Sequence, residues 1–146
     1  MARIKNKNRE IAKKYFSIEE AEKLLASIGR ILNRTVKINK ALDLLSSIEI
    51  EVYDDDYNNI RRVTKLNKQF HKLSYEFYSK IERIEDMGGV IRDFDIGVVD
   101  FYSNYCGKEI FLSWKLGEKK IKFWHEVDSD YAGRMPIVDL INRVDF

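Results

Sequence analysis

The spacing of apolar residues changes once along this chain, and the change at Gly88 constrains the fold more than any other feature. Before Gly88, apolar residues recur every three or four positions through two long segments, which is typical of amphipathic helices. After Gly88 they alternate with polar residues, as they do in half-buried strands. Helices followed by strands within 146 residues predict a single α+β domain.

The first helical segment begins at a clear N-terminal signal. Ser17 and Glu20 have the spacing of a capping box, and Phe16 is placed for a hydrophobic staple. The helical spacing of apolar residues then continues to about residue 52. We therefore expect one helix that runs from residue 18 to about residue 52.

A second helical segment follows a short acidic interruption at Asp54, Asp55 and Asp56, which are good N-cap residues. Its apolar spacing is heptad-like and ends at Gly88, a good C-cap, so the two segments predict a long antiparallel two-helix hairpin with coiled-coil character. Residue numbers that face each other should sum to about 107 in such a hairpin. This geometry would place Asn39 beside Asn67.

Four short strands are predicted after the hairpin, at residues 89–93, 96–102, 109–115 and 120–126. Their short, glycine-containing connections require consecutive strands to be antiparallel, so they form a small four-stranded β-meander. Alternation places Ile110, Leu112 and Trp114 on one face and Asp100 of the preceding strand on the other. A meander of this size needs a cover for its apolar face, which we expect the hairpin to supply.

The net charge of +2 conceals an uneven distribution. Basic residues dominate the first 14 positions, where Glu10 is the one acidic residue. We interpret residues 1–14 as a basic flexible tail and residues 15–146 as one domain, with the hairpin at 15–87 and the meander and C-terminal segment at 88–146. Basic arms bind polyanions, although a solvated terminus carries the same signal.

The cellular compartment is predicted from what the sequence lacks. No apolar run approaches the length that spans a bilayer, and the N-terminus lacks the apolar core of a signal peptide. Cys106 is the one cysteine and cannot form an internal disulfide, which agrees with a reducing compartment. We therefore expect a cytoplasmic protein without a membrane partner.

Five sequence blocks, spread over nearly the whole chain after the tail, form a specific combination. They are YFSIEEAEKLL at 15–25, GVIRDFDIGVVDF at 89–101, LSWKLGE at 112–118, WHE at 124–126 and AGRMPI at 132–137. In these blocks the chain resembles a known prokaryotic group, domain of unknown function family 2203. The resemblance implies helices followed by a small sheet and implies no established activity. Family members often carry Cys where this chain has Ser113, so the resemblance implies no thiol chemistry at that position here.

Carboxylates and a histidine gather on or beside the predicted meander. Asp100, His125 and Glu126 are candidates for acid–base catalysis, because a histidine beside a carboxylate can transfer protons. Asp93, Asp95, Asp100 and His125 are candidate metal ligands. Their spacing matches no known metal motif, and Asp93 and Asp95 also suit a turn. A metal-dependent or acid–base enzyme is thus one alternative, with its cofactor unknown.

Arg134 lies beside a glycine in the AGRMPI block. An arginine in such a turn could bind a phosphate or a carboxylate through two parallel hydrogen bonds, which makes it a candidate anion-binding residue. It could equally pair with Asp93, Asp128 or Asp130 and fix the C-terminal segment.

Basic residues follow both helical segments without acidic neighbours, since every charged residue in 23–41 and in 57–75 is basic. The candidate nucleic-acid contacts on these stripes are Arg30, Arg34, Lys37, Arg61, Lys65, Lys68, Lys72 and Tyr75. Ordinary helices mix the two signs to gain pairs between neighbouring turns, so this segregation favours a polyanion partner such as RNA or the ribosome. Pairing with the acidic meander or with a second copy is the alternative.

A homodimer through the hairpin is a further alternative. Two hairpins could form a four-helix bundle that buries apolar positions such as Leu24, Ile31 and Leu44. The leading interpretation is a non-catalytic RNA- or ribosome-associated protein, with an enzyme and a self-associating helical scaffold as its rivals.

Overall fold

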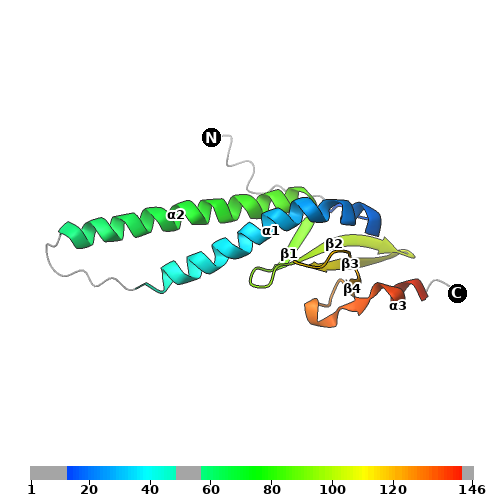
Figure 1. The fold of residues 1–146 in the computed structure, drawn as a ribbon. Helices are drawn as coiled ribbons and strands as arrows, with labels where there is room; N and C mark the ends of the chain where they lie inside the picture. Colours follow the sequence, from blue (N-terminus) through cyan, green and yellow to red (C-terminus); the bar gives the residue numbers. More distant parts are fainter. Residues whose placement is uncertain (1–12, 49–56, 143–146) are drawn as a thin grey trace.

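The computed structural model describes residues 13–48 and 57–142, with two long helices followed by an antiparallel sheet (Figure 1). The helices and strands are α1 (Ile18–Ser46), α2 (Tyr57–Asp86), β1 (Gly89–Asp93), β2 (Val98–Tyr105), β3 (Lys108–Lys115), β4 (Phe123–Glu126), the 3₁₀ helix η2 (Tyr131–Gly133), β5 (Met135–Pro136) and α3 (Ile137–Asn142). This arrangement confirms the predicted α+β class with its helical hairpin and meander. Within the described residues, no helix combines the length and the apolar character needed to cross a membrane.

Helix α1 begins as predicted and ends earlier than predicted. The Ser17 hydroxyl accepts a hydrogen bond from the Glu20 amide at 3.1 Å, as a capping residue should. The expected end near residue 52 was wrong, because the helix ends at Ser46. The Ser46 and Ser47 hydroxyls donate to the carbonyls of Leu42 and Leu44, so side chains satisfy acceptors of the last turn. The predicted N-cap at 54–56 lies outside the described residues.

Helix α2 ends at Asp86, and Gly88 follows it with a φ of 98°. A side chain at Gly88 would be strained at this φ, and its Cβ would lie 2.5 Å from Cζ of Phe16. The glycine therefore lets the chain leave α2 and enter β1 beneath the Phe16 ring, which confirms the predicted end of the helix.

The expected pairing of Asn39 with Asn67 across the hairpin is not formed. Arg34 of α1 contacts Glu76 of α2, and these residue numbers sum to 110, against the predicted value of about 107. Asn39 does not pair with Asn67, because its Nδ2 donates to Asp95 Oδ1 at 3.1 Å in the turn after β1. Asn67 is exposed instead. The ends of α1 and α2 that lie away from the sheet diverge from each other (Figure 1).

The sheet is a meander in the order β1-β2-β3-β4-β5, with every pair antiparallel. The two-residue strand β5 pairs with β4 and was not predicted, so the sheet has five strands rather than four. Strand β2 begins at Val98 instead of residue 96 and β4 at Phe123 instead of residue 120. Strand β2 also continues to Tyr105, because Cys106 and Gly107 both have positive φ and form the two-residue turn to β3.

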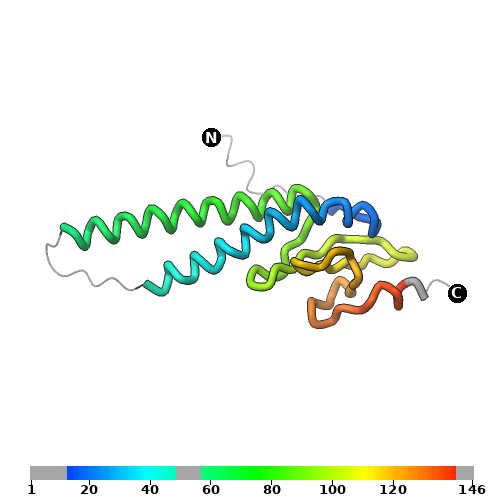
Figure 2. The backbone as a smooth tube through the Cα atoms, in the orientation of Figure 1, coloured from blue at the N-terminus to red at the C-terminus, as the bar shows by residue number. Residues whose placement is uncertain are grey.

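One continuous core joins α1 to the inner face of the sheet. From α1 it takes Ala21, Leu25, Ile28 and Leu32, and from the sheet Val99, Phe101, Ile110, Leu112, Trp114 and Trp124. The predicted face of β3 is therefore confirmed. Figure 2 shows that the first part of α1 and the last part of α2 lie near the sheet, whereas the other halves of both helices extend beyond it. The hairpin thus presents a long projecting surface.

Candidate functional site

The outer face of the sheet, opposite α1, carries a buried cluster of charged groups. His125 Nε2 lies 2.7 Å from Asp100 Oδ2, and Arg92 Nε donates to the same oxygen at 2.9 Å. The side chains of Asp100 and His125 have no exposed surface. Arg92 lies at the irregular step in the β1–β2 register between Ile91 and Asp93. The structure thus brings two of the predicted catalytic residues together and adds Arg92, which sequence reasoning missed.

Both ring nitrogens of His125 face acceptors, because Nδ1 lies 2.8 Å from the Glu126 carbonyl oxygen. A doubly protonated imidazolium can donate to both acceptors at once. Burial alone would lower the pKa of His125, but the hydrogen bonds to Asp100 and to the Glu126 carbonyl, with the nearby Asp100 charge, hold that pKa above its ordinary value of 6.5. The geometry and the direction of the pKa change both favour the charged form.

The Phe111 ring packs against two members of this cluster. The rings of Phe111 and His125 are 5.3 Å apart, and the Arg92 guanidinium lies 4.6 Å from the Phe111 ring centroid. The buried atoms Asp100 Oδ1 and Ser113 Oγ have no hydrogen-bond partner within the described residues. Neither Asp100 nor His125 lines the hollows found on the described part of the hairpin.

The four candidate metal ligands do not gather in one place. Asp93 Oδ1 accepts from the amides of Asp95 and Ile96 at 2.7 and 2.9 Å, which is the turn geometry named as the alternative. Asp95 in turn accepts from Asn39, so it shares no partner with the Asp100–His125 pair. Across residues 13–48 and 57–142, no group of three or more His, Cys, Asp or Glu side chains is arranged to hold a metal ion.

Glu126, the third catalytic candidate, lies at the end of β4 and forms an ion pair with Lys108 of β3. Its backbone carbonyl, rather than its carboxylate, contacts His125. The three catalytic candidates therefore do not form a single carboxylate–histidine–carboxylate arrangement.

Arg134 is held inside the protein by several contacts. Its Nη2 donates to Glu118 Oε1 at 2.7 Å and to the Ser113 carbonyl at 3.2 Å, and its guanidinium lies 4.1 Å from the Phe123 ring centroid and 4.7 Å from that of Tyr131. Only 10% of its side chain is exposed.

An internal ion pair was one of the two interpretations of Arg134, but the partners named for it, Asp93, Asp128 and Asp130, were wrong. The partner is Glu118, which follows the turn glycine Gly117 and also accepts from the Lys115 amide at 2.6 Å. The place of Glu118 directly after the turn glycine was the feature of the sequence that could have indicated this pairing.

Sequence reasoning missed Glu76, the carboxylate that joins the basic stripe of α1 to that of α2. Glu76 of α2 accepts from Arg34 Nε and Nη2 at 2.8 and 3.0 Å, and Lys80 Nζ lies 3.7 Å from its Oε2. The hydrogen bond from Arg34 is the largest influence on Glu76 and lowers its pKa. Because Arg34 belongs to the α1 stripe, this contact places the α1 stripe next to the face of α2 that carries Glu76.

That face of α2 is the basic one. With about 100° of rotation for each residue, Lys65, Lys72 and Arg83 point within about 40° of Glu76. The two adjoining faces, called here the basic surface, comprise Arg30, Arg34, Lys37, Arg61, Lys65, Lys68, Lys72, Lys80 and Arg83. Seven of these nine residues, all except Arg34 and Lys80, lack a carboxylate partner within the described residues. All seven are exposed. Tyr75 borders the surface and is 78% exposed.

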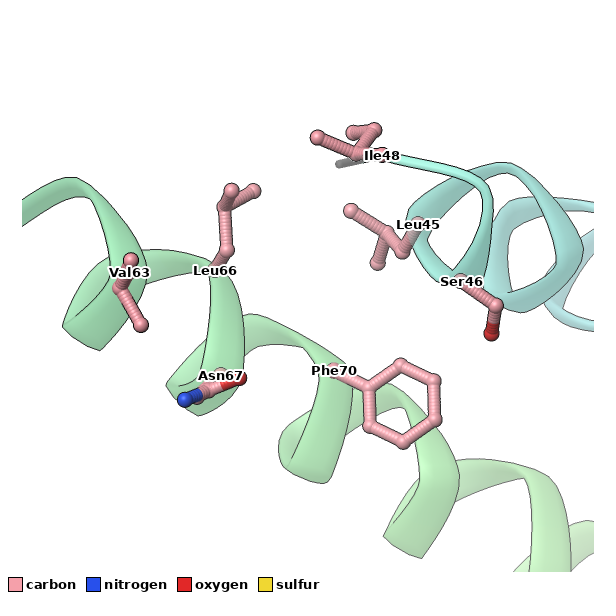
Figure 3. A pocket seen from close by; sticks show the side chains of 7 residues that line it. All are labelled: Leu45, Ser46, Ile48, Val63, Leu66, Asn67 and Phe70. Carbon is pink, nitrogen blue, oxygen red and sulfur yellow. The ribbon is translucent and has the colours of Figure 1, made fainter. Parts of the chain in front are cut away.

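The diverging ends of the two helices enclose a hollow that is lined mainly by apolar side chains. This distal hollow has a volume of about 410 Å³, and Figure 3 shows the side chains around it. It is lined by Leu45, Ser46, Ile48, Val63, Leu66, Asn67 and Phe70. Of the positions expected to be left over for self-association, Ile31 is buried and Leu24 packs against the core, whereas Leu44 is 69% exposed.

Comparisons with known proteins identify a family and no closer relative. No curated protein and no solved structure matches the chain. A family model described as an uncharacterized conserved protein matches residues 14–137, which include both long helices and all five strands. This match confirms the resemblance noted in the sequence blocks. The chain therefore belongs to the DUF2203 family of uncharacterized conserved proteins.

Proposed function

We propose that this protein is a non-catalytic, cytoplasmic RNA-binding protein, associated with RNA alone or with the ribosome, that contacts phosphates through the basic surface of its hairpin. One observation carries the proposal. Seven exposed cations on two adjoining helix faces have no carboxylate partner in the described parts of the chain. The basic N-terminal tail would add to this surface.

The proposal rests on the unfavourable free energy of like charges that lie side by side on the hairpin. Like charges one helical turn apart repel each other, and a mixture of signs would remove the repulsion. A bound polyanion also removes this repulsion, and the release of its condensed counterions makes the free energy of binding more favourable. From Arg61 to Arg83 the surface extends along about 33 Å of helix, given a rise of about 1.5 Å per residue, so it can contact several phosphates. The exposed ring of Tyr75 is available to stack on a base.

A charge-reversal experiment with a matched control tests the proposal. The triple variant Lys65→Glu, Lys68→Glu, Lys72→Glu changes the basic surface, and the triple variant Lys119→Glu, Lys120→Glu, Lys122→Glu makes the same change in net charge beside the sheet. All six lysines are exposed. Fluorescence anisotropy with a labelled single-stranded RNA should show that affinity falls at least about 100-fold in the first variant, because each lysine–phosphate contact contributes roughly 1 kcal/mol.

The control should retain most of the native affinity. Equal decreases in both variants would mean that only net charge matters, and tight binding by the first variant would contradict the proposal. Capture of RNA or ribosomes from a lysate at low salt, with release at high salt, would distinguish the two kinds of target.

Self-association is a second candidate, favoured by the apolar distal hollow. Leu44 and Ile48 at the end of α1 and Ile60 near the start of α2 are 69%, 50% and 52% exposed. A second copy that docks its own distal end would cover these side chains. Sedimentation over a wide range of concentrations tests this candidate, and a monomer throughout would remove it.

An acid–base role for Asp100, His125 and Glu126 stays a prediction from the sequence. The Asp100–His125 contact is the arrangement that such a role would need. The same two side chains are enclosed, and a substrate would have to reach them.

A further inference from the structure

The basic surface contains a hollow at the base of the hairpin, where α1 and α2 run side by side. It has a volume of about 360 Å³ and is lined by Ser27, Arg30 and Ile31 of α1 and by Lys80, Arg83 and Met87 of α2. Arg30 lies two positions beyond the core residue Ile28, so it points to the opposite side of α1 from the sheet. The hollow therefore opens on the solvent side of the hairpin.

The lining of this hollow carries three cations, Arg30, Lys80 and Arg83. Among the described residues no carboxylate lines it, and the neighbouring Glu76 is shared between Arg34 at 2.8 Å and Lys80 at 3.7 Å. Arg30 and Arg83 are exposed and have no carboxylate partner within residues 13–48 and 57–142. Glu76 thus pairs with two of these four cations, and the charge on Arg30 and Arg83 is the charge that an anion would neutralise.

We propose that this hollow binds a phosphate group. The two guanidiniums offer planar pairs of donors that match phosphate oxygens, Lys80 adds a point charge, and the Ser27 hydroxyl adds a neutral donor. Ile31 and Met87 give an apolar wall for the sugar or base that carries the phosphate. The volume lies at the lower end of the range of about 300–1,000 Å³ for small-ligand sites.

This hollow differs from the rest of the basic surface in geometry. Along α2, the cations from Arg61 to Lys72 come from one helix and face solvent on one side. In the hollow, cations from two helices converge on one space, so a phosphate can be held from more than one direction. Contacts of this kind fix the position of a nucleic acid without reading its sequence. The identification of that phosphate as part of RNA rests on the proposed function.

The first test uses inorganic phosphate as the probe. In NMR titrations of the native protein, amide shifts should concentrate at residues 27–31 and 80–87. The double variant Arg30→Gln, Arg83→Gln should lose these shifts, and the control Lys119→Gln, Lys122→Gln should keep them. Shifts spread evenly over the exposed lysines, or shifts unchanged in the double variant, would overturn the proposal.

The second test identifies the source of the phosphate with two RNA oligonucleotides of one sequence, one with a 5′-phosphate and one with a 5′-hydroxyl. The double variant should bind about ten-fold or more weakly, because it can no longer form two charge-assisted hydrogen bonds to the phosphate. Weaker binding of both oligonucleotides assigns the hollow to a backbone phosphodiester, and weaker binding of the phosphorylated one alone assigns it to the terminal phosphate.

The outcomes separate this proposal from the proposed function. If the native protein binds RNA in a salt-sensitive way and the double variant binds both oligonucleotides as tightly as the native protein does, the hollow is not an RNA phosphate site while the proposed function stands. If the native protein binds no RNA but inorganic phosphate gives the localised shifts, the proposed function fails and the phosphate site stands.

Discussion

Two arginines that pack at the sheet and three arginines on the hairpin have opposite surroundings. Arg92 bonds to buried Asp100 and lies on the Phe111 ring, and Arg134 bonds to Glu118 between two aromatic rings. On the hairpin, Arg30, Arg61 and Arg83 are exposed and have no carboxylate partner among the described residues. The comparison shows that the same side chain holds the fold together in one region and is available to an outside partner in the other.

The difference follows from what surrounds each guanidinium. The outer face of the sheet supplies carboxylates and aromatic rings at fixed positions, because strand alternation directs neighbouring side chains to one side. On the basic surface of the hairpin, the carboxylate of Glu76 contacts Arg34 and Lys80, and the other neighbours along the same face are basic. Substitutions in the sheet should therefore change stability, and substitutions on the hairpin should change binding.

The largest effect is expected for Asp100→Ala. Removal of the carboxylate leaves His125 buried beside Arg92 without its partner, and breaking a buried ion pair from one side costs about 3–5 kcal/mol. Urea unfolding would measure the loss of stability, with Asp95→Ala as the control at an exposed turn position. A loss below about 1 kcal/mol would mean that the buried cluster does not stabilise the sheet.

A smaller effect is expected for Arg134→Lys, compared with Arg83→Lys on the hairpin. A lysine at position 134 cannot stack between Phe123 and Tyr131 while it bonds to Glu118, so we expect the free energy of unfolding to fall by about 1–3 kcal/mol. The same change at Arg83 should alter the free energy of unfolding by less than about 0.5 kcal/mol. If thermal unfolding showed equal decreases of stability in the two variants, the proposed contrast between the sheet and the hairpin would be contradicted.

The pH dependence of stability should come from the sheet. The pKa of folded His125 is raised above 6.5, so protonation of this group contributes stability that is fully present below about 6.5 and is lost as pH rises through the raised value. Native protein and the His125→Gln variant should be compared by urea unfolding from about pH 6 to about pH 9. A stability difference that grows with pH would contradict the assignment of the charged form.

The smallest effect on stability is expected for the hairpin variant Lys65→Glu, Lys68→Glu, Lys72→Glu. These lysines are exposed and make no ion pair with a described residue, so the free energy of unfolding should change by no more than about 0.5 kcal/mol for each substitution. A cooperative loss of several kcal/mol in chemical unfolding would show that the stripe has a structural role.

Features set by neighbours in the chain could be predicted from the sequence. The capping box at Ser17, the end of α2 before Gly88 and the first strand all depend on residues a few positions apart. The outward direction of Asp100 also follows from alternation alone. Local patterns therefore predicted the α+β class, the hairpin and the meander.

Features set by distant partners could not be predicted in the same way. The contacts of Arg34 with Glu76, Asn39 with Asp95 and Arg134 with Glu118 join residues 42, 56 and 16 positions apart. Each depends on the angle at which elements pack, and several carboxylates were compatible with each donor. Strand β5 was also missed, because two residues are too few to show the alternation of apolar and polar residues that predicts a strand.

The most direct test of the central claim is the salt dependence of RNA binding by the native protein and by the Lys65→Glu, Lys68→Glu, Lys72→Glu variant. Each phosphate contact on a single strand contributes about 0.7 to the slope of log affinity against log salt concentration. If the basic surface binds RNA, the native slope should be steep, and the variant slope should be shallower by about 2. Binding that is insensitive to salt, or equal slopes for the two proteins, would contradict the claim that the unpaired cations of the hairpin form the binding surface.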